Sequence, residues 1–497
     1  MIALADLLSA AGITPTAPVA NVLVSGIVHD SREVLPGSLF VAVTGRRQDG
    51  HGHAAAAAAA GAIAVLAEHE VNPSPGVPVV VVDNSRIALS ALAAAWFHHP
   101  SRAMTVAGIT GTDGKTTTST MLWAAWQAAA LHAGEISTVD FREGDTVTAN
   151  TTRLTTMEAL ETQRRLAGLR DAGCTHVALE TSSHALEMHR VDDVEYRAAV
   201  YTRITSEHLD VHRDREGYLT AKARLLGLVS AREDGLAVLD RDDDFAYPRL
   251  SVMGVASRLT YSVADPRADL MAEAVTSGPE GVRLRARTPW GDAEMQLHLA
   301  GRFNAANALA ALATACATGA RFDSAVAGIA SLERVDGRME RIDLGQPFGV
   351  VIDYAHTTDA LEKVLIELRL ATQGRLWVVF GSAGERDVEK RAAMGEAAGR
   401  LADVVVVTDE DPRSEDRLSI CEQIAAAAER AGARRGDSLH VIPDRAEAIG
   451  RAVGAAAAGD MILCAGKGHE SSILTATGSL PWSERATVEA AVRARLG

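Results

Sequence analysis

The chain has 497 residues, 47% hydrophobic and 23% charged, a composition typical of a globular protein with two to four domains. Its formal charge of −15 argues against a nucleic acid or an anionic membrane as partner, because both bind basic faces. The four cysteines are scattered without a C-x-x-C pair, so neither a disulfide framework nor a zinc site is indicated.

The sequence shows neither a secretion signal nor a membrane-spanning segment. Residues 1–12 lack a basic start and carry Asp6 inside their apolar part, which argues against a signal peptide. The longest uncharged stretch, residues 116–134, contains Thr, Gln and His and indicates a buried helix rather than a membrane span. We therefore expect a soluble, cytoplasmic protein.

Residues 1–98 form a first predicted unit of strands and helices. Strands are predicted at 39–43, 62–68 and 77–83, and helices at 54–60 and 85–96. Polar loops at 29–32 and 45–50 follow strand signals, where small α/β units place ligands. Ordinary surface turns are the alternative for both loops.

The second predicted unit, residues 99–335, begins with a glycine turn. An apolar run at 104–109 predicts a buried strand, the turn follows at 111–114, and Lys115-Thr116-Thr117 opens a helical segment. Backbone N–H groups, a helix N-terminus, a lysine and a hydroxyl in this order are typical of a phosphate cradle. The spacing from Gly108 to Gly114 is one residue longer than usual, so a chance glycine turn is the alternative.

Further along this unit, strands are predicted to end at Glu180 and near His208. Alternating segments around 278–281 and 289–292 predict hairpins, and a helix is predicted at 303–318. A carboxylate at Glu180 suits Mg²⁺, although a strand-end Glu is more often a surface residue.

Two other groups of this unit give weaker signals. His208-x-Asp210-x-His212 would share one face of an extended segment, but the further ligands that zinc needs cannot be assigned. Lys222 lies four residues after Tyr218, on the same side of a predicted helix, and by itself indicates a solvated lysine.

The third predicted unit, residues 336–497, alternates strands and helices most regularly. Strands are predicted at 349–353, 376–381, 403–408, 439–442 and 460–464, so a parallel, doubly wound sheet is expected. Ligands of such sheets bind outside the carboxyl ends of the strands. The segments expected to line one crevice there are 353–356, 381–387, 409–413 and 466–470.

The expected crevice holds charges of both signs. Arg386, Arg413, Lys467 and Glu470 suit a zwitterionic or diamino-acid ligand, with arginine forks gripping a carboxylate. Unrelated surface charges are the alternative.

Taken in order, these segments resemble the Mur ligases of peptidoglycan synthesis, most closely the members that add the third residue of the peptide. The resemblance covers nearly the whole chain, and the ordered set is far more specific than any single motif. The motifs are DSR (30–32), GTDGKTT (111–117), LTTMEAL (154–160), ETSSHAL (180–186), HLDVH (208–212), GRFNAAN (301–307), GRMER (337–341), DYAHTTDAL (353–361), GSAGERD (381–387), DEDPR (409–413) and AGKGHE (465–470).

The resemblance implies an α/β protein with the three-domain Mur ligase architecture. Residues 1–98 would bind the UDP of the substrate, residues 99–335 would be a P-loop ATPase-like domain, and residues 336–497 a Rossmann-like domain for the amino acid. ATP with Mg²⁺ would phosphorylate the D-Glu carboxylate of UDP-MurNAc-L-Ala-D-Glu, and the amine of a diamino acid would attack the acyl phosphate. The carboxylate and the phosphate are both negatively charged and repel each other, so this step needs electrostatic neutralisation. The enzyme is expected to act as a monomer, without nucleic acid or membrane.

The resemblance also implies roles for individual residues. Lys115, His208 and Lys222 would be catalytic, with Lys222 carbamylated and supporting a second metal, contrary to its reading as a solvated lysine. ATP would contact Gly111, Thr112, Asp113, Gly114, Lys115, Thr116, Thr117, Asn304, Arg338 and Asp353. The metal ligands would be Thr116, Glu180, His208 and carbamylated Lys222. The UDP-substrate would contact His29, Ser31, Arg46, Arg47, Gln48, Thr155, Thr156, Ser182, Met188 and Arg190. The amino acid would contact Arg386, Glu410, Asp411, Pro412, Arg413, Gly466 and Glu470.

Three residues depart from the family pattern. Asp113 stands where Asn is usual, and Met188 replaces a commonly polar substrate contact. The signature D-N-P-R, associated with meso-diaminopimelate, is here Glu410-Asp411-Pro412-Arg413. Arg413 could grip the distal carboxylate of diaminopimelate, whereas Asp411 would repel it and attract an ammonium. The sequence thus slightly favours meso-diaminopimelate over L-lysine or ornithine.

Other functions fit fewer segments. A related ligase with another acceptor, such as a folylpolyglutamate synthase relative, leaves the first unit and LTTMEAL unexplained. A P-loop regulatory or transport ATPase leaves the charged crevice unused. A dinucleotide-binding oxidoreductase is opposed by GSAG, which lacks the G-x-G-x-x-G spacing.

Overall fold

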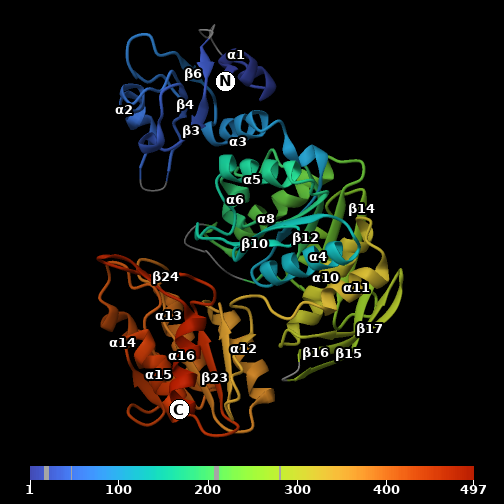
Figure 1. The fold of residues 1–497 in the computed structure, drawn as a ribbon, viewed down its shortest axis with the longest axis vertical. Helices are drawn as coiled ribbons and strands as arrows, with labels where there is room; N and C mark the ends of the chain where they lie inside the picture. Colours follow the sequence, from blue (N-terminus) through green and yellow to red (C-terminus); the bar gives the residue numbers. More distant parts are fainter. Residues whose placement is uncertain (16–21, 46–47, 206–211, 279–280) are drawn as a thin grey trace.

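The computed structural model describes residues 1–15, 22–45, 48–205, 212–278 and 281–497. Three lobes follow one another along the chain, with the N-terminus in one end lobe and the C-terminus in the other (Figure 1). Within the described ranges, every helix is too short or too polar to cross a membrane. The predicted three-part α/β architecture is confirmed, while the boundaries at residues 98/99 and 335/336 stay predictions.

The N-terminal lobe is a small α/β unit built on a four-stranded parallel sheet of order β3-β4-β5-β6. Apolar residues of this sheet pack against α1 and α3 on one side and α2 on the other. Asn84 caps α3 by accepting from Arg86 N and Ile87 N. The elements are β1 (Ile2–Ala3), α1 (Leu4–Ala10), β2 (Leu23–Val24), β3 (Gly26–Val28), η1 (Ser31–Glu33), β4 (Ser38–Val41), η2 (Gly50–His53), α2 (Ala54–Ala59), β5 (Ala64–Ala67), β6 (Val79–Val81), α3 (Ser85–Trp96) and η3 (Pro100–Ala103).

The central lobe is organised on one sheet of order β10-β9-β8-β11-β7-β12-β13-β14-β15-β16-β17. The strands from β8 to β15 in this order run parallel, and antiparallel strands flank them on both sides. The strands are β7 (Thr105–Thr110), β8 (Ala133–Ile136), β9 (Asp140–Glu143), β10 (Thr146–Ala149), β11 (His176–Glu180), β12 (Tyr196–Tyr201), β13 (Leu236–Asp240), β14 (Ser257–Ser262), β15 (Leu270–Gly278), β16 (Gly281–Thr288) and β17 (Gly291–Leu297).

Helices cover both faces of this sheet because its central strands are apolar on both sides. Ala107 and Ile109 of β7 pack toward α4, α10 and α11, whereas Val106 faces α5, α6 and α8. The helices are α4 (Lys115–Ala128), α5 (Ala159–Asp171), α6 (Ser183–Glu187), α8 (Arg215–Ser230), α9 (Tyr247–Leu250), α10 (Phe303–Ala317) and α11 (Phe322–Ala330). The predicted hairpins and the end of β11 at Glu180 are confirmed.

One predicted strand of the central lobe is too long. The sequence predicts a strand ending near His208, but β12 ends at Tyr201. The chain leaves the sheet because residues 202–205 bond to the glycine turn: Thr112 N donates to Arg203 O (2.7 Å), and Thr202 Oγ1 donates to Asp113 O (2.6 Å). Likewise, the helix predicted within 116–134 ends at Ala128, and β8 follows.

The C-terminal lobe is a doubly wound sheet of order β18-β19-β23-β20-β21-β22, parallel except at β18. One face packs against α12, α13 and α14, and the other against α15 and α16. This confirms the predicted strand and helix alternation. The elements are β18 (Glu340–Arg341), β19 (Gly349–Asp353), α12 (Thr358–Ala371), β20 (Leu376–Phe380), α13 (Glu389–Leu401), β21 (Val404–Val407), α14 (Arg417–Arg430), β22 (Leu439–Val441), α15 (Arg445–Ala455), β23 (Met461–Ala465), β24 (Ser472–Thr475), β25 (Gly478–Pro481) and α16 (Glu484–Leu496).

Candidate active site

The glycine turn between β7 and α4 has no room for side chains at two positions. Gly114 has a left-handed φ of +84°, and a Cβ there would lie 2.4 Å from Asn307 Oδ1. A Cβ at Gly111 would lie 1.8 Å from Thr202 Oγ1. The turn therefore brings bare backbone and the N-terminus of α4 together, which is the arrangement that binds phosphate groups.

Two side chains at the start of α4 complete this cradle. The Lys115 ammonium lies over the turn, where Nζ donates to Gly111 O (3.1 Å) and Thr112 O (2.8 Å). Thr116 is buried, and its hydroxyl accepts a hydrogen bond from Arg338 Nη2 (3.1 Å). A residue beyond the central sheet thus reaches the cradle, so Arg338 adds a second positive charge to that of Lys115.

Glu180 is buried at the end of β11, next to the strand that leads into the cradle. Its carboxylate accepts from Thr138 N (3.1 Å) and Thr138 Oγ1 (2.8 Å). The alternative of a surface glutamate is therefore wrong. With the Thr116 hydroxyl, this carboxylate supplies the hard oxygen donors that Mg²⁺ prefers.

Lys222 is buried, so the reading of this residue as a solvated helix lysine is wrong. Its Nζ donates to Gly111 O (2.7 Å) and lies 4.5 Å from the centre of the Tyr218 ring, on the predicted side of α8. Lys222 therefore contacts the cradle at Gly111. Whether it is carbamylated stays a prediction.

The structure describes only the last residue of the HLDVH motif. His208 and Asp210 lie outside the described residues. His212 is buried, with Nε2 3.0 Å from Ser183 Oγ and Nδ1 2.8 Å from Glu187 Oε2. Its ring nitrogens thus contact α6, while the proposed metal contact of His208 stays a prediction.

Of two further residues predicted to bind ATP, Asn304 lies near the cradle, and Asp353 lies near Arg338. Asn304 accepts a hydrogen bond from Asn307 Nδ2 (2.9 Å), and the Asn307 side chain lies against Gly114. Asp353, at the end of β19, accepts from Met339 N (2.7 Å) and Ala355 N (2.8 Å). Burial raises the pKa of Asp353, against the opposing effect of the Arg338 charge.

The residues predicted to hold the muramoyl-dipeptide also lie together. Thr156 Oγ1 donates to Glu180 O (2.8 Å) and accepts from Ser182 N (2.9 Å). Arg190 donates to Thr156 O (3.2 Å) and to the Met188 sulfur (3.6 Å). Thr155, which precedes Thr156, is half-buried. This cluster adjoins the strand that ends in Glu180.

The predicted uridine contacts lie in the N-terminal lobe. His29, just after β3, and Ser31, the first residue of η1, are half-buried, and Gln48 is exposed. Arg46 and Arg47 lie outside the described residues.

Two of the segments predicted to line the crevice, 409–413 and 466–470, lie together at the carboxyl edge of the C-terminal sheet. The buried Lys467 ammonium donates to Asp411 Oδ1 (2.8 Å) and to Glu470 Oε2. A Cβ at Gly466 would lie 3.7 Å from Glu410 Oε2, so these two residues also lie side by side.

The other residues predicted to bind the amino acid are placed differently. Arg413 has a left-handed φ of +55°, and its N–H donates to Leu474 O (2.9 Å). The Pro412 carbonyl approaches Gly384, where a Cβ would lie 2.1 Å from it. Arg386 is exposed on the loop after β20.

Sequence reasoning missed two residues that join the lobes. Arg153 of the central lobe contacts Asp411, with Nη1 3.3 Å from Oδ2. Lys363 of α12 donates to Asp113 Oδ2 in the glycine turn (3.2 Å). Each pair is separated by 250 residues or more, so nothing in the local pattern could have indicated it.

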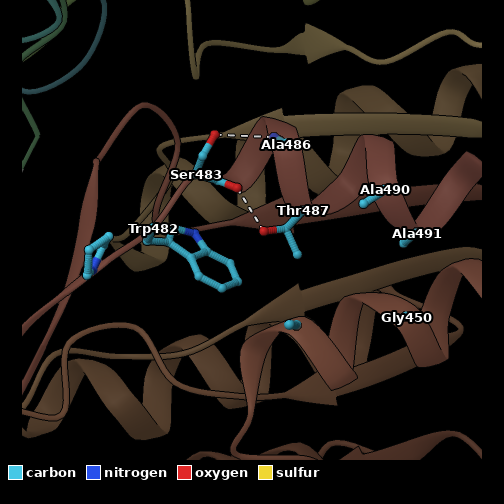
Figure 2. Close-up of a pocket in the computed structure, with 9 residues that line it drawn as sticks. Gly450, Trp482, Ser483, Ala486, Thr487, Ala490 and Ala491 are labelled. Carbon is cyan, nitrogen blue, oxygen red and sulfur yellow. Dashed lines mark hydrogen bonds between the residues drawn. The ribbon is translucent and has the colours of Figure 1, made fainter.

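A separate hollow of about 540 Å³ lies between α15 and α16 (Figure 2). Trp482 lies at one end, and small residues such as Gly450, Ala490 and Ala491 line the rest. None of the residues predicted to bind a ligand lines it, so it is separate from the candidate active site.

Family models match the chain in three consecutive stretches. The Mur ligase family catalytic domain matches residues 23–97, the Mur ligase middle domain 109–315, and the Mur ligase glutamate ligase domain 337–468. A UDP-N-acetylmuramyl-tripeptide synthetase of Roseiflexus sp. (strain RS-1) is 45% identical, covering 97% of this chain and 96% of that protein.

Two further proteins extend this similarity. A UDP-N-acetylmuramoyl-L-alanyl-D-glutamate--2,6-diaminopimelate ligase of Streptomyces coelicolor is 39% identical, covering 99% of this chain and 97% of that one. A solved structure of a ligase with the same name is 30% identical, with a TM-score of 0.67 over 99% of both chains. The chain belongs to the Mur ligase family.

Proposed function

We propose that the protein is an ATP-dependent ligase that joins a diamino acid to the D-Glu carboxylate of UDP-MurNAc-L-Ala-D-Glu. The observation that carries this proposal is the contact of Arg338 with Thr116, which joins the glycine turn to the lobe that holds the charged crevice. A simple ATPase has no need for this crevice. The similarity to tripeptide synthetases and diaminopimelate ligases supports the same reaction.

The reaction proceeds in two displacements. A carboxylate oxygen of D-Glu attacks the γ-phosphorus of ATP, the bond to the β-phosphate oxygen breaks, and ADP leaves. The amine of the diamino acid then attacks the acyl carbon, phosphate leaves with the carbon–oxygen electron pair, and the amine loses a proton. Lys115 and Arg338 place positive charge where two anions approach each other, and the Thr156 cluster orients the dipeptide.

The donors beside the cradle fit Mg²⁺. Thr116 offers a hydroxyl and Glu180 a buried carboxylate, and few protein ligands are usual for this ion when it binds a nucleotide. When bound, Mg²⁺ neutralises phosphate charge. His208 and carbamylated Lys222 are proposed to bind a second metal ion.

Among the third residues, meso-diaminopimelate is favoured. The buried Nε of Arg413 has no hydrogen-bond partner among the described residues, which leaves it suited to a distal carboxylate. Asp411 was expected to attract a terminal ammonium, but Lys467 and Arg153 already contact its carboxylate. One argument for L-lysine is thereby weakened.

We further propose that the enzyme acts as a cytoplasmic monomer. The charge of −15 does not favour nucleic acid or an anionic membrane as a partner. Light scattering of the purified protein tests the monomer, and a mass of twice 52.2 kDa would contradict it.

Phosphate release tests the proposed reaction directly. The protein is incubated with UDP-MurNAc-L-Ala-D-Glu, ATP and Mg²⁺, together with diaminopimelate, lysine, ornithine or diaminobutyrate. The proposal predicts phosphate release and a new tripeptide product that require all components. Phosphate release that is independent of both dipeptide and amino acid would contradict it.

A further inference from the structure

A loop of the central lobe carries Arg153 toward the C-terminal lobe. The loop follows β10 and turns around Asn150, whose Oδ1 accepts from Thr152 N (2.9 Å) and whose Nδ2 donates to Leu154 O (3.0 Å). Asn150 Nδ2 also donates to Ser137 O (2.8 Å), which ties the loop to the main sheet. Arg153 itself has a left-handed φ of +60°. These bonds fix the direction of the loop, so the position of Arg153 is built into the fold.

The Arg153 guanidinium contacts the C-terminal lobe at two points. Its Nη1 lies 3.3 Å from Asp411 Oδ2, and its Nη2 donates to Ser472 O (2.8 Å). The other oxygen of Asp411 accepts from Lys467 Nζ (2.8 Å) and Leu474 N (2.8 Å). Asp411 is therefore held by one cation from each lobe.

The charges in this cluster balance. Asp411 and Glu470 carry two negative charges, and Lys467 and Arg153 carry two positive ones. Only Lys467 is wholly buried, whereas the Arg153 side chain is 29% exposed and comes from a different lobe. Without Arg153, these side chains would carry one more negative charge than positive charges.

We propose that Arg153 is a specificity-determining residue, which neutralises Asp411 from the central lobe so that the pocket accepts an amino acid with a distal carboxylate. This inference rests on the proposed ligase function. It assigns Arg153 a positioning role through Asp411. Because Thr155 and Thr156 follow Arg153 by two and three residues, the same segment links the dipeptide cluster to the proposed amino-acid pocket.

The test is the selectivity of Arg153→Gln. We expect its ratio of kcat/KM for L-lysine to kcat/KM for meso-diaminopimelate to rise about tenfold over the parent, mainly through KM for the amino acid. Arg153→Lys should restore part of the parent ratio, because it keeps the charge. In an Asp411→Asn background, Arg153→Gln should change the ratio little, since the charge that it compensates is gone.

Arg164→Gln is the matched control, because Arg164 is an exposed arginine of the neighbouring α5 that pairs with Glu161. It should leave the ratio unchanged. A parent that ligates an amino acid, together with an Arg153→Gln variant of unchanged ratio, would overturn the inference while leaving the proposed function intact. A parent that forms no product with any of the diamino acids would overturn both.

Discussion

The Arg338 guanidinium donates a hydrogen bond from Nη2 to Thr116 Oγ1 over 3.1 Å, and it lies 4.5 Å from the centre of the Tyr354 ring. Thr116 belongs to the helix that starts at the phosphate cradle, whereas Tyr354 follows the first parallel strand of the C-terminal sheet. Arg338 thus connects the two lobes at the glycine turn and the start of α4. Its planar fork suits this position because it can stack on the ring and donate at its edge simultaneously.

Replacing Arg338 with lysine should weaken ATP binding. Lysine keeps the charge but loses the fork and the stacking, so we expect KM for ATP to rise about tenfold. The dependence of phosphate release on ATP concentration measures this change. Arg334→Lys is the control, because Arg334 is an exposed arginine nearby in the sequence that pairs with Asp336. Equal KM values for parent and Arg338→Lys would contradict the role of Arg338.

Replacing Asp113 with asparagine should have the opposite effect on ATP. Burial opposes the charge on Lys363, yet Asp113 and Asp359 hold its pKa above the ordinary value. Asp113→Asn removes an anion beside the phosphates and leaves the Lys363 cation, so KM for ATP should fall about threefold at low salt.

Salt and a second variant check that this effect is electrostatic. Raising the ionic strength should shrink the difference between Asp113→Asn and the parent. The double variant with Lys363→Met should lose the gain, since the cation is also removed. A gain that survives in the double variant would show that Lys363 is not its source.

Glu135 should make the stability of the central lobe depend on pH. It is buried on β8, accepts from Thr120 Oγ1 (2.8 Å) and lies 2.9 Å from Arg142 Nε. Burial raises its pKa from 4.5 to about 8, and the nearby Arg142 charge offsets this only in part. Its contribution to stability is therefore full below pH 4.5 and is lost as the pH rises toward 8.

Glu135→Gln removes this titration. The free energy of unfolding of the variant, relative to the parent, should rise by roughly 3 kcal/mol between about pH 5 and 8. Urea unfolding at several pH values measures the difference. Parallel pH profiles for the two proteins would show that Glu135 keeps an ordinary pKa.

Local patterns in the sequence were sufficient for the elements that carry the site. Apolar residues followed by a polar one mark where a buried strand leaves a sheet. Two apolar runs of this kind, ending at Glu180 and at Asp353, are strands that end at these residues. The glycine turn was also predicted from the sequence. Close packing against Thr202 and Asn307 excludes side chains there, so these positions require glycine.

Contacts between segments far apart in the chain could not be predicted from the sequence. Tyr201 ends its strand early because Thr202 and Arg203 bond to the glycine turn, which no local pattern records. The burial of Lys222 arises in the same way, from its bond to Gly111 across 111 residues. The pairing of Arg153 with Asp411 depends on how two lobes meet, which the residues around neither partner indicate.

The central claim is that a triphosphate held at residues 111–117 activates the D-Glu carboxylate for attack by an amine. The most direct measurement is the rate of tripeptide formation by Lys115→Ala, with its folding checked by circular dichroism. Because Lys115 supplies a full positive charge directly at the glycine turn, we predict a loss of about 10²-fold or more in kcat/KM for ATP. Tripeptide formation by Lys115→Ala at the rate of the parent would contradict the claim.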